Sequence, residues 1–211
     1  MKIAFLGYGN VGAPLADHLQ RLGHEVTLAA ADAESEGVRK ALARNSGLKV
    51  AAVESAVTSD DVVFLATPFG ANEGLLRPLS GALRGKVLVD CTNPVGPGLS
   101  HGLGSAQSGS EFVQRLLPDT RVVKAFSICG FENFEDNRYP AFSVRPVMMF
   151  CGNDANAKSA VSALIEALGW EPLDVGGLEQ ALHLEHMTLL WVRMVRANKR
   201  SPHMVWAKLS R

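Results

Sequence analysis

The sequence has few cysteines, no excess of charge of either sign and no long apolar run. Its three cysteines lack the spacing of metal ligands, which is typical of reduced thiols in the cytosol. Lys plus Arg and Asp plus Glu each total 21, so the formal net charge is zero. Because nucleic-acid binding needs a basic surface, this balance argues against DNA or RNA as a partner. No apolar run reaches the ~20 residues that cross a bilayer.

The N-terminus does not resemble an export signal, because only four apolar residues stand between Lys2 and Gly7. We therefore expect a cytoplasmic protein without a membrane span. The chain has 211 residues, of which 47% are hydrophobic. A chain of this length buries a core without disulfides or metals. We expect a single NAD(P)-binding domain over residues 1–211.

Short apolar, β-branched runs alternate with helical patterns along the chain. The strands are expected at residues 3–6, 26–30, 49–53, 62–66, 87–89, 147–151 and 170–175, with another from residue 122. Helices are expected at residues 11–22, 39–44, 157–168 and from residue 178. This alternation is typical of the α/β class, so we predict a Rossmann-type doubly wound, mostly parallel sheet with a short C-terminal helical extension.

Two segments fall outside the alternation. Residues 96–109 are rich in Gly and Ser and contain Pro97, so we expect a mobile loop there. Residues 177–211 would form a helix and a basic tail, and the nearly all-apolar stretch 187–195 predicts a helix that is buried all round. The tail could lie on a membrane surface, but docking on the protein or packing in a homodimer is the favoured interpretation.

The strongest motif is a G-x-G-x-x-G made of Gly7, Tyr8, Gly9, Asn10, Val11 and Gly12. It follows a predicted strand directly and opens an amphipathic helix. In that context the first glycine permits a tight turn, the second lets the backbone approach a pyrophosphate, and the third lets the helix pack closely on the strand. The diphosphate would then bind the free N–H groups at the helix N-terminus. We predict NADP(H) or NAD(H) as the cofactor.

The choice between NAD and NADP is made at the end of the second strand. An acidic residue there suits the ribose 2′-OH of NAD, whereas Arg and small hydroxyls suit the 2′-phosphate of NADP. This chain has Ala30 and Ala31 at that place, followed by Asp32, which could bind a ribose or cap the next turn. Basic residues of the next helix could reach a phosphate or form a solvated face: Arg39, Lys40 and Arg44. The residues leave the choice open.

Three further corners at strand ends are candidate cofactor contacts. They are Thr67, Pro68 and Phe69; Asn93 and Pro94; and Ala125 and Phe126. Ligands of open α/β sheets bind beyond the carboxyl ends of the strands, near the switch point. Simple turn formation also explains a Thr-Pro or Asn-Pro pair. The coincidence of three such corners with three strand ends favours cofactor binding.

The sequence lacks a Ser-His-Asp order, an activated cysteine and paired carboxylates placed for acid–base work, so we predict no catalytic side chain. Hydride transfer needs orientation and water exclusion more than a protein acid or base. One cluster suggests a metal site: His183, Glu185 and His186, with His101 as a further candidate. Because two helical histidines without a defined third ligand are usually structural, we predict no metal.

Several spaced motifs occur in order along nearly the whole chain. They are the glycine motif at 7–12, Thr67-Pro68, Val89-Asp90-Cys91-Thr92-Asn93-Pro94, Val122-Val123-Lys124-Ala125-Phe126, Cys151-Gly152-Asn153-Asp154, Gly169-Trp170-Glu171-Pro172, Asp174-Val175-Gly176, and Leu184-Glu185 to Leu190-Trp191. With them the chain resembles the F420-dependent NADP reductases. The resemblance implies hydride transfer between NADP(H) and the deazaflavin coenzyme F420 or a flavin as co-substrate. A related domain serves membrane ferric reductases.

The chain departs from this family at three places. The family typically has Ser or Asn, then Arg, where Ala30 and Ala31 stand, which leaves NADP preference open. It commonly continues Lys-Ala-Phe with Asn-Thr, whereas Ser127 and Ile128 follow here, and this change would alter the floor of the acceptor site. His186 replaces a proline after the helical Glu.

The leading hypothesis is an NAD(P)H-dependent oxidoreductase with a small-molecule hydride acceptor of the flavin or deazaflavin type. A non-catalytic dinucleotide-binding sensor is a second hypothesis. A third is a reductase of a small imine or carbonyl metabolite. That chemistry usually needs a helical domain that closes on the substrate, and too little chain follows residue 175 to build one, unless a homodimer through the C-terminal helix supplies it.

Overall fold

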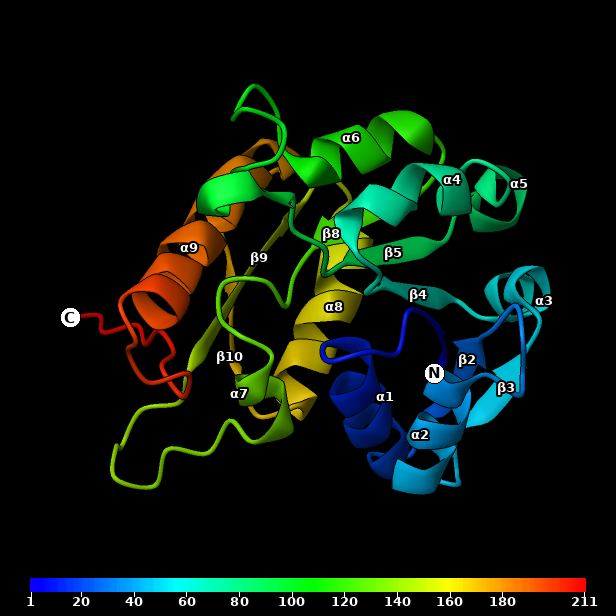
Figure 1. Cartoon of the computed structure of the whole chain (residues 1–211), viewed down its shortest axis with the longest axis horizontal. Coiled ribbons are helices and arrows are strands. Elements are labelled where there is room, and N and C mark those ends of the chain that lie inside the picture. The colour runs from blue at the N-terminus through cyan, green and yellow to red at the C-terminus, as the bar shows by residue number, and fades with distance from the viewer.

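Eight strands form one sheet in the computed structural model, which describes residues 1–211 (Figure 1). The strands are β1 (Lys2–Leu6), β2 (Glu25–Ala29), β3 (Lys49–Ala51), β4 (Val62–Leu65), β5 (Val87–Asp90), β8 (Arg121–Lys124), β9 (Val147–Gly152) and β10 (Glu171–Asp174). Their order across the sheet is β10-β9-β8-β5-β4-β1-β2-β3. Every neighbouring pair is parallel except β8 and β9. The predicted doubly wound, mostly parallel sheet is therefore confirmed.

The chain changes direction across the sheet between β1 and β4. It builds β1, β2 and β3 toward one edge and then returns to build β4, β5 and β8 toward the other. Such a switch point leaves a crevice beyond the carboxyl ends of the central strands. The glycine motif follows β1 and lies at this crevice.

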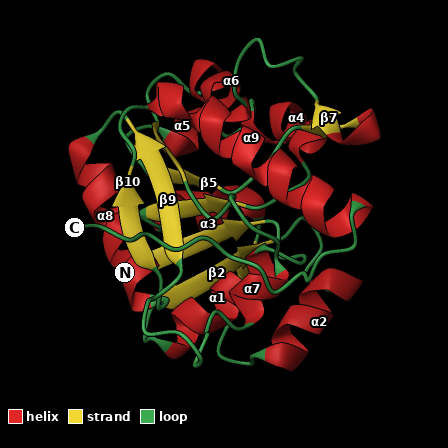
Figure 2. Ribbon diagram, turned by 90° about the vertical axis from the view of Figure 1, so that its left-hand side faces the viewer, coloured by secondary structure: helices red, strands yellow, loops and turns green.

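Helices cover both faces of the sheet. They are α1 (Gly12–Arg21), α2 (Glu36–Arg44), α3 (Val53–Ser59), α4 (Asn72–Leu76), α5 (Ser80–Leu83), α6 (Gly109–Leu116), α7 (Glu132–Glu135), α8 (Ala155–Ala167) and α9 (Ala181–Val192). Single 3-10 turns lie at Phe69–Ala71, Pro97–Leu99 and Leu178–Gln180, and a π-type turn at Arg193–Ala197 extends α9. The helices α8 and α9 lie on opposite sides of β9 and β10 (Figure 2).

The central strand β4 shows how the two layers are held. All four of its residues are buried. Val62 and Phe64 join one hydrophobic cluster with residues of α1 and α8, whereas Val63 and Leu65 join a second cluster with residues of α3, α4 and α6. Because successive side chains of a strand point to opposite faces, a continuous apolar run is what a strand covered on both faces requires.

Five short helices were not predicted from the sequence: α3, α4, α5, α6 and α7. Their apolar pattern covers too few turns to stand out, but α6 carries a local signal. Ser108 accepts a hydrogen bond from the N–H of Glu111, and the Glu111 carboxylate accepts one from the N–H of Ser108. This reciprocal capping box fixes the start of the helix.

The expectation of a plain loop over residues 96–109 is wrong. The strands β6 (Val95–Gly96) and β7 (Ser100–His101) form a small antiparallel hairpin there. His101 and Ser108 are buried, so the segment packs on the protein. The expectation that residues 187–195 are buried all round is also wrong, because Leu190 on the outer side of α9 is 51% exposed.

The C-terminal tail docks on the protein through backbone carbonyls and through the side chains of residues 204–206, which pack against the core. The carbonyls of Pro202, His203 and Met204 accept hydrogen bonds from the side chains of Asn133, Tyr139 and Trp191, respectively. The carbonyl of Trp206 accepts a 2.8 Å hydrogen bond from the N–H of Val147 at the start of β9. None of the helices has the length and apolar character needed to cross a membrane.

Candidate dinucleotide-binding site

The glycine motif joins β1 to α1 in a turn that larger residues would not fit. Gly7 has φ +95°, and a Cβ there would lie 2.7 Å from the carbonyl carbon of Ala66. A Cβ on Gly12 would lie 2.0 Å from the carbonyl oxygen of Gly7. These two glycines therefore have the geometric roles that the sequence predicted: one makes the tight turn, and the other lets the helix approach the strand.

Gly9 differs from the other two glycines of the motif. A Cβ built on it would have no heavy atom within 4 Å. The backbone at Gly9 is exposed, so a ligand can approach it closely. A glycine that the fold itself does not require fits a position reserved for contact with a ligand.

The start of α1 offers unpaired backbone donors. The first hydrogen bond of the helix runs from the N–H of Ala13 to the carbonyl of Gly9 at 2.9 Å. The N–H groups of residues 9–12 donate no hydrogen bond within the chain, and no side chain caps the helix at Val11. Free N–H groups and the positive end of the helix dipole together favour an anion such as a diphosphate.

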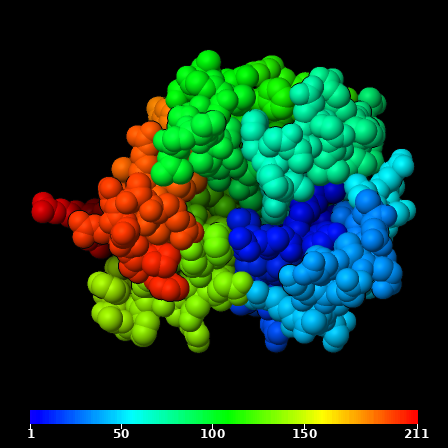
Figure 3. Space-filling model, in the orientation of Figure 1, coloured from blue at the N-terminus to red at the C-terminus, as the bar shows by residue number.

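A cavity of about 380 Å³ opens beside the glycine motif. We call it the glycine-loop hollow. It lies at the carboxyl ends of β1, β2 and β4, and its lining consists of Leu6, Gly7, Tyr8, Gly9, Ala29, Ala31, Gly37, Val53, Thr67 and Leu75. In Figure 3 the N-terminal segment, in dark blue, forms the floor of a recess between the light-blue and cyan parts of the surface. The hollow lies at the switch point, where the doubly wound topology predicts a ligand.

The end of β2 carries no cation that faces the hollow. Ala30 is buried, whereas Ala31 is exposed and lines the hollow. The Asp32 carboxylate accepts a 2.8 Å hydrogen bond from the N–H of Glu34, so it caps the following turn, which is one of its two predicted roles.

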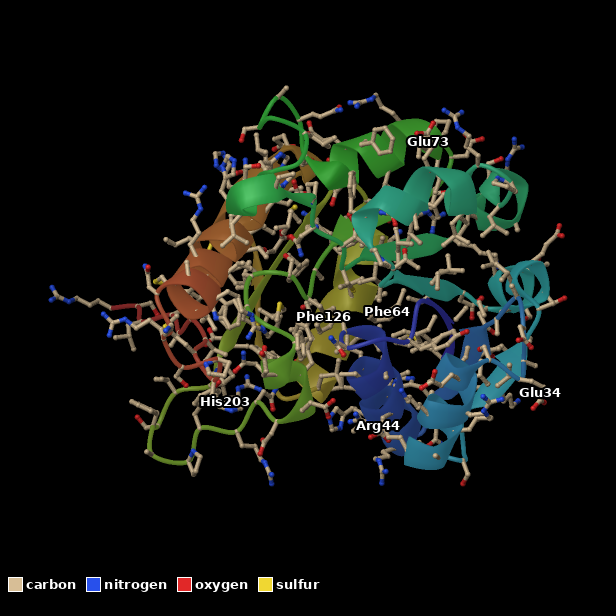
Figure 4. All side chains as sticks on the ribbon, viewed as in Figure 1. Glu34, Arg44, Phe64, Glu73, Phe126 and His203 are labelled. Carbon is tan, nitrogen blue, oxygen red and sulfur yellow. The ribbon has the colours of Figure 1, made fainter.

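The three basic residues of α2 have partners elsewhere. Arg39 donates to the carbonyl of Glu34, and Lys40 pairs with Glu36 at 2.6 Å. Arg44 binds Asp17 at 2.9 Å and Glu135 at 2.5 Å, at the opposite end of α2 from Glu34 (Figure 4). The structure therefore shows no preformed pocket of positive charge for a 2′-phosphate.

The corner after β4 is linked to the corner after β5 by side chains. Thr67 donates through Oγ1 to Asn72 at 2.9 Å, and Asn72 donates through Nδ2 to Oγ1 of Thr92 at 3.0 Å. Pro68 is exposed and Phe69 is half-buried. These contacts bring two of the three predicted corners together along the carboxyl edge of the sheet.

The residues after β5 differ in accessibility. Asn93 is half-buried, and its Oδ1 atom is buried without a hydrogen-bond partner. Pro94 is buried, so it offers no surface for a ligand. A buried unsatisfied oxygen is unusual in a folded protein. It is consistent with a site that a polar group of a ligand or a water would complete.

The third predicted corner, Ala125 and Phe126, does not line the site. Ala125 and Phe126 are 0% and 1% exposed, so neither can line a ligand in this conformation. The Phe126 ring belongs to the core, where its centroid lies 5.8 Å from that of Phe64 and 6.1 Å from that of Phe134 (Figure 4). Phe126 has φ +52°, and this turn directs the ring inward.

A buried ion cluster stands at this corner instead, formed by Asp90, Lys124 and Glu185. All three side chains have 0–1% exposure. The Lys124 ammonium lies 3.7 Å from Oδ2 of Asp90 and 3.5 Å from Oε1 of Glu185. Burial alone would lower the pKa of Lys124, but the two carboxylates outweigh it and raise the pKa above its usual value. The sequence analysis did not foresee that these carboxylates pair through a lysine.

His101 completes the surroundings of Glu185. Its Nε2 lies 2.8 Å from Oε2 of Glu185, while its Nδ1 accepts hydrogen bonds from the N–H groups of Leu103 and Ser105, both at 3.2 Å. Because Nδ1 is an acceptor, the proton is on Nε2 and is donated to Glu185. His183 and His186 are exposed on α9. The His186 ring lies 5.6 Å from that of His101, but the structure has no group of three His, Cys, Asp or Glu side chains placed to hold a metal ion.

Comparisons with known proteins agree with this geometry. The family model described as "NADP oxidoreductase coenzyme F420-dependent" matches residues 2–94. The chain is 32% identical to the F420-dependent NADP reductase of Methanothermobacter marburgensis, and the alignment covers 94% of each protein. A crystal structure from Arthrobacter sp. FB24, itself assigned provisionally as an F420-dependent NADP-reductase, is 30% identical, with a TM-score of 0.81 over 94% of this chain and 95% of that one.

Two further similarities concern parts of larger proteins. The chain is 32% identical over 89% of its length to Metalloreductase STEAP3 of Rattus norvegicus, but it spans only 36% of that protein. An imine reductase of Streptomyces aurantiacus shares the fold, with 20% identity and a TM-score of 0.65 over 62% of its chain. The full-length match to a reductase at 32% identity decides the assignment. The chain belongs to the family of F420-dependent NADP reductases.

Proposed function

We propose that the chain is an NADPH-dependent oxidoreductase that transfers hydride between the dinucleotide and coenzyme F420. The observation that carries this proposal is the set of unpaired N–H groups at residues 9–12, beside the glycine-loop hollow that Gly9 lines. These donors fit a diphosphate. The full-length relatives are F420-dependent NADP reductases, and their activity supplies the identity of the two substrates.

We propose contacts for each part of the dinucleotide. The diphosphate would bind at the glycine motif, and the adenosine half would extend into the hollow past Ala31 and Asp32. The nicotinamide half would lie toward the ends of β4 and β5, near Thr67 and Asn93, with Pro68 and Phe69 at the rim. Of the candidates named from the sequence, Ala30, Pro94, Ala125 and Phe126 are left out because they are buried.

The protein's own part in the reaction would be binding, orientation and exclusion of water. When bound, the reduced nicotinamide supplies the hydride, and an oxidised deazaflavin takes it up together with a proton from the solvent. We assign no side chain as an acid or base. Holding two rings in a reactive arrangement accounts for a large part of the rate enhancement in such transfers.

Discrimination between NADPH and NADH should be weak. NADP-specific sites place Arg or hydroxyl groups at the end of the second strand. Here Ala31 lines that end, and the nearby cations bind other groups. We therefore propose that NADPH is used but that NADH binds with comparable affinity.

Titration and turnover test the proposal. Calorimetry should detect binding of NADPH, and loss of the nicotinamide absorbance band should follow addition of F420. The variant Gly9→Val should remain folded but lose binding, because its side chain enters the open space at the motif. Gly81→Val is the matched control, since its Cβ also has no neighbour within 4 Å but lies on α5. A parent protein that binds neither NADPH nor NADH would exclude the proposed function.

We further propose a single-domain, cytoplasmic enzyme that forms a homodimer through α9. The support for the dimer is the outer side of that helix, where Leu190 is 51% exposed. Zero net charge supports a small-molecule acceptor rather than a nucleic acid. Light scattering after size-exclusion chromatography measures the mass, and Leu190→Glu should then give a monomer. A monomeric parent would exclude the dimer.

A further inference from the structure

Thr92, at the carboxyl end of β5, is held by hydrogen bonds on all of its polar groups. Its N–H and Oγ1 both donate to Oδ1 of Asp90, at 2.9 and 2.7 Å. Its Oγ1 also accepts from Asn72, and its carbonyl accepts from the ammonium of Lys124. Thr92, which immediately precedes Asn93, is therefore held by one residue each of α4, β5 and β8.

Lys124 is held in turn by groups from other elements. Its carboxylate partners are Asp90 on β5 and Glu185 on α9. The Glu185 carboxylate also accepts from the N–H of Gly109 at 2.9 Å and from His101, while Oδ2 of Asp90 accepts from Oγ of Ser110 at 2.6 Å. The buried ion cluster thus ties β5, β8, α9 and the start of α6 together at one point.

Stability alone does not require such an arrangement. Removing charged groups from water costs several kcal/mol per ion, and well-packed apolar residues of similar volume are often as stable or more stable. Buried ionic groups can instead select one arrangement among several that pack equally well. In this protein the buried ionic groups fix the path of the backbone at Thr92 and Asn93.

We propose that the buried ion cluster of Asp90, Lys124 and Glu185 is a positioning device that sets Thr92 and Asn93 for the nicotinamide half of the bound dinucleotide. This inference rests on the proposed function. Lys124 is completely buried and so does not touch the ligand; it acts through the carbonyl of Thr92. The adenosine half binds at β1 and β2, away from the cluster, and should not depend on it.

A variant that keeps the net charge of the cluster tests this role and leaves one buried carboxylate, Asp90, without a cation instead of two. Lys124→Met alone would leave two buried carboxylates without a cation, so we combine it with Glu185→Gln. Asp90 then keeps its three hydrogen bonds from Thr92 and Ser110. The control is Lys158→Met on α8, because Lys158 also binds a carboxylate, Asp174 at 2.9 Å, together with a carbonyl, that of Gly176, but lies outside the cluster.

Two binding measurements separate the halves of the ligand. Affinity for 2′,5′-ADP, which carries only the adenosine half, should stay within about twofold of the parent. Affinity for NADPH should fall roughly tenfold, and the fluorescence of bound NADPH should shift toward that of the free form. The rate of hydride transfer should fall on the order of 100-fold, as expected for a misplacement of about 1 Å. The control should match the parent in all four measurements.

A further measurement uses the protein without any ligand. Amide hydrogen exchange at residues 91, 92, 93 and 95 should become faster in the double variant than in the parent, because the Thr92 carbonyl loses its donor. The inference is overturned if the double variant matches the control in NADPH affinity, fluorescence and rate. It is also overturned if affinities for 2′,5′-ADP and NADPH fall equally, since the cluster then only supports the fold. A parent that binds no dinucleotide would instead overturn the proposed function, and this inference with it.

Discussion

A methyl group on Gly12 would lie 2.0 Å from the carbonyl oxygen of Gly7. That separation is far below a van der Waals contact, and neither atom can rotate away, because the oxygen belongs to the backbone and a Cβ has its position fixed by the backbone. The closeness of α1 to β1 therefore depends on a hydrogen atom at this position. It also determines where the free N–H groups of the helix lie.

Gly12→Ala should accordingly destabilise the protein although Ala is the better helix former. Overpacking of this kind costs about 3 kcal/mol. Urea denaturation measures the free energy of unfolding. The control is Gly81→Ala on α5, where nothing lies within 4 Å and the change should stabilise by roughly 0.5 kcal/mol. Equal effects of the two variants would contradict the crowding at Gly12.

Ala31→Arg should raise the affinity for NADPH relative to NADH. A guanidinium matches the geometry and charge of a phosphate, and a tenfold change in the ratio of the two dissociation constants corresponds to about 1.4 kcal/mol. Ala31 is exposed and lines the glycine-loop hollow, so the new side chain has room to turn inward. Calorimetric titration with both dinucleotides gives the ratio.

Ala43→Arg is the matched control for that substitution, since Ala43 is exposed on α2 but does not line the hollow. It adds the same charge to the protein without placing it beside the ribose. An unchanged ratio in Ala31→Arg, or an equal rise in both variants, would show that the end of β2 does not hold the 2′-phosphate.

Asp17 should make the stability depend on acid pH. Burial would raise the pKa of this carboxyl, but the hydrogen bonds from Arg21, Arg44 and Asn45 together lower it below 3.8. A lowered folded-state pKa contributes stability that is present above the ordinary value and is lost as the pH falls below it. Asp17→Asn should therefore lose about 2 kcal/mol at neutral pH.

The difference between the parent and Asp17→Asn should shrink as the pH falls through 3.8 and lower. Urea denaturation of both proteins at several pH values measures this difference in the free energy of unfolding. Asp119→Asn is the control, because Asp119 belongs to a solvent-exposed pair with Arg84 at 3.3 Å, and such pairs contribute little. A difference that stays constant down to low pH would contradict the role of the Asp17 charge.

Tyr139 should titrate later than an ordinary tyrosine. Burial, with the nearby Cys129 and Asp136, raises the pKa of Tyr139 to about 12. A raised folded-state pKa contributes stability that is complete below the ordinary value and is lost as the pH rises toward 12. Ultraviolet titration of the native protein should show this late phase, and Tyr139→Phe should remove it. A native titration without a phase that Tyr139→Phe removes near 12 would contradict the prediction.

Local features of the fold could be read from the sequence, whereas contacts between distant segments could not. The turn at Gly7 and the fully buried β4 follow from a few adjacent residues, and the structure has both. The ion cluster joins residues from β5, β8 and α9, and no local pattern places Glu185 beside Lys124. A charged residue at the end of an apolar strand was the available signal, since a buried Lys requires a partner.

The misassigned corner has a related cause. A position at the end of a strand was expected to face the ligand, and Thr67 and Asn93 do lie at that edge. The side chain of Phe126 turns into the core because its backbone adopts φ +52°. That backbone angle could not be predicted from the sequence. Ser108 and Glu111 carried a readable start signal for α6 in their spacing of three.

The docked tail is recognised by its main chain, because three successive carbonyls, those of Pro202, His203 and Met204, accept hydrogen bonds from side chains of the domain. Any residue presents the same carbonyl. Substitutions at residues 202 and 203 should therefore be tolerated. Substitutions of the donors Asn133, Tyr139 and Trp191 would remove the hydrogen bonds. Residues 202 and 203 can thus diversify in sequence while the tail keeps its path, whereas the side chains of Met204, Val205 and Trp206 pack against the core.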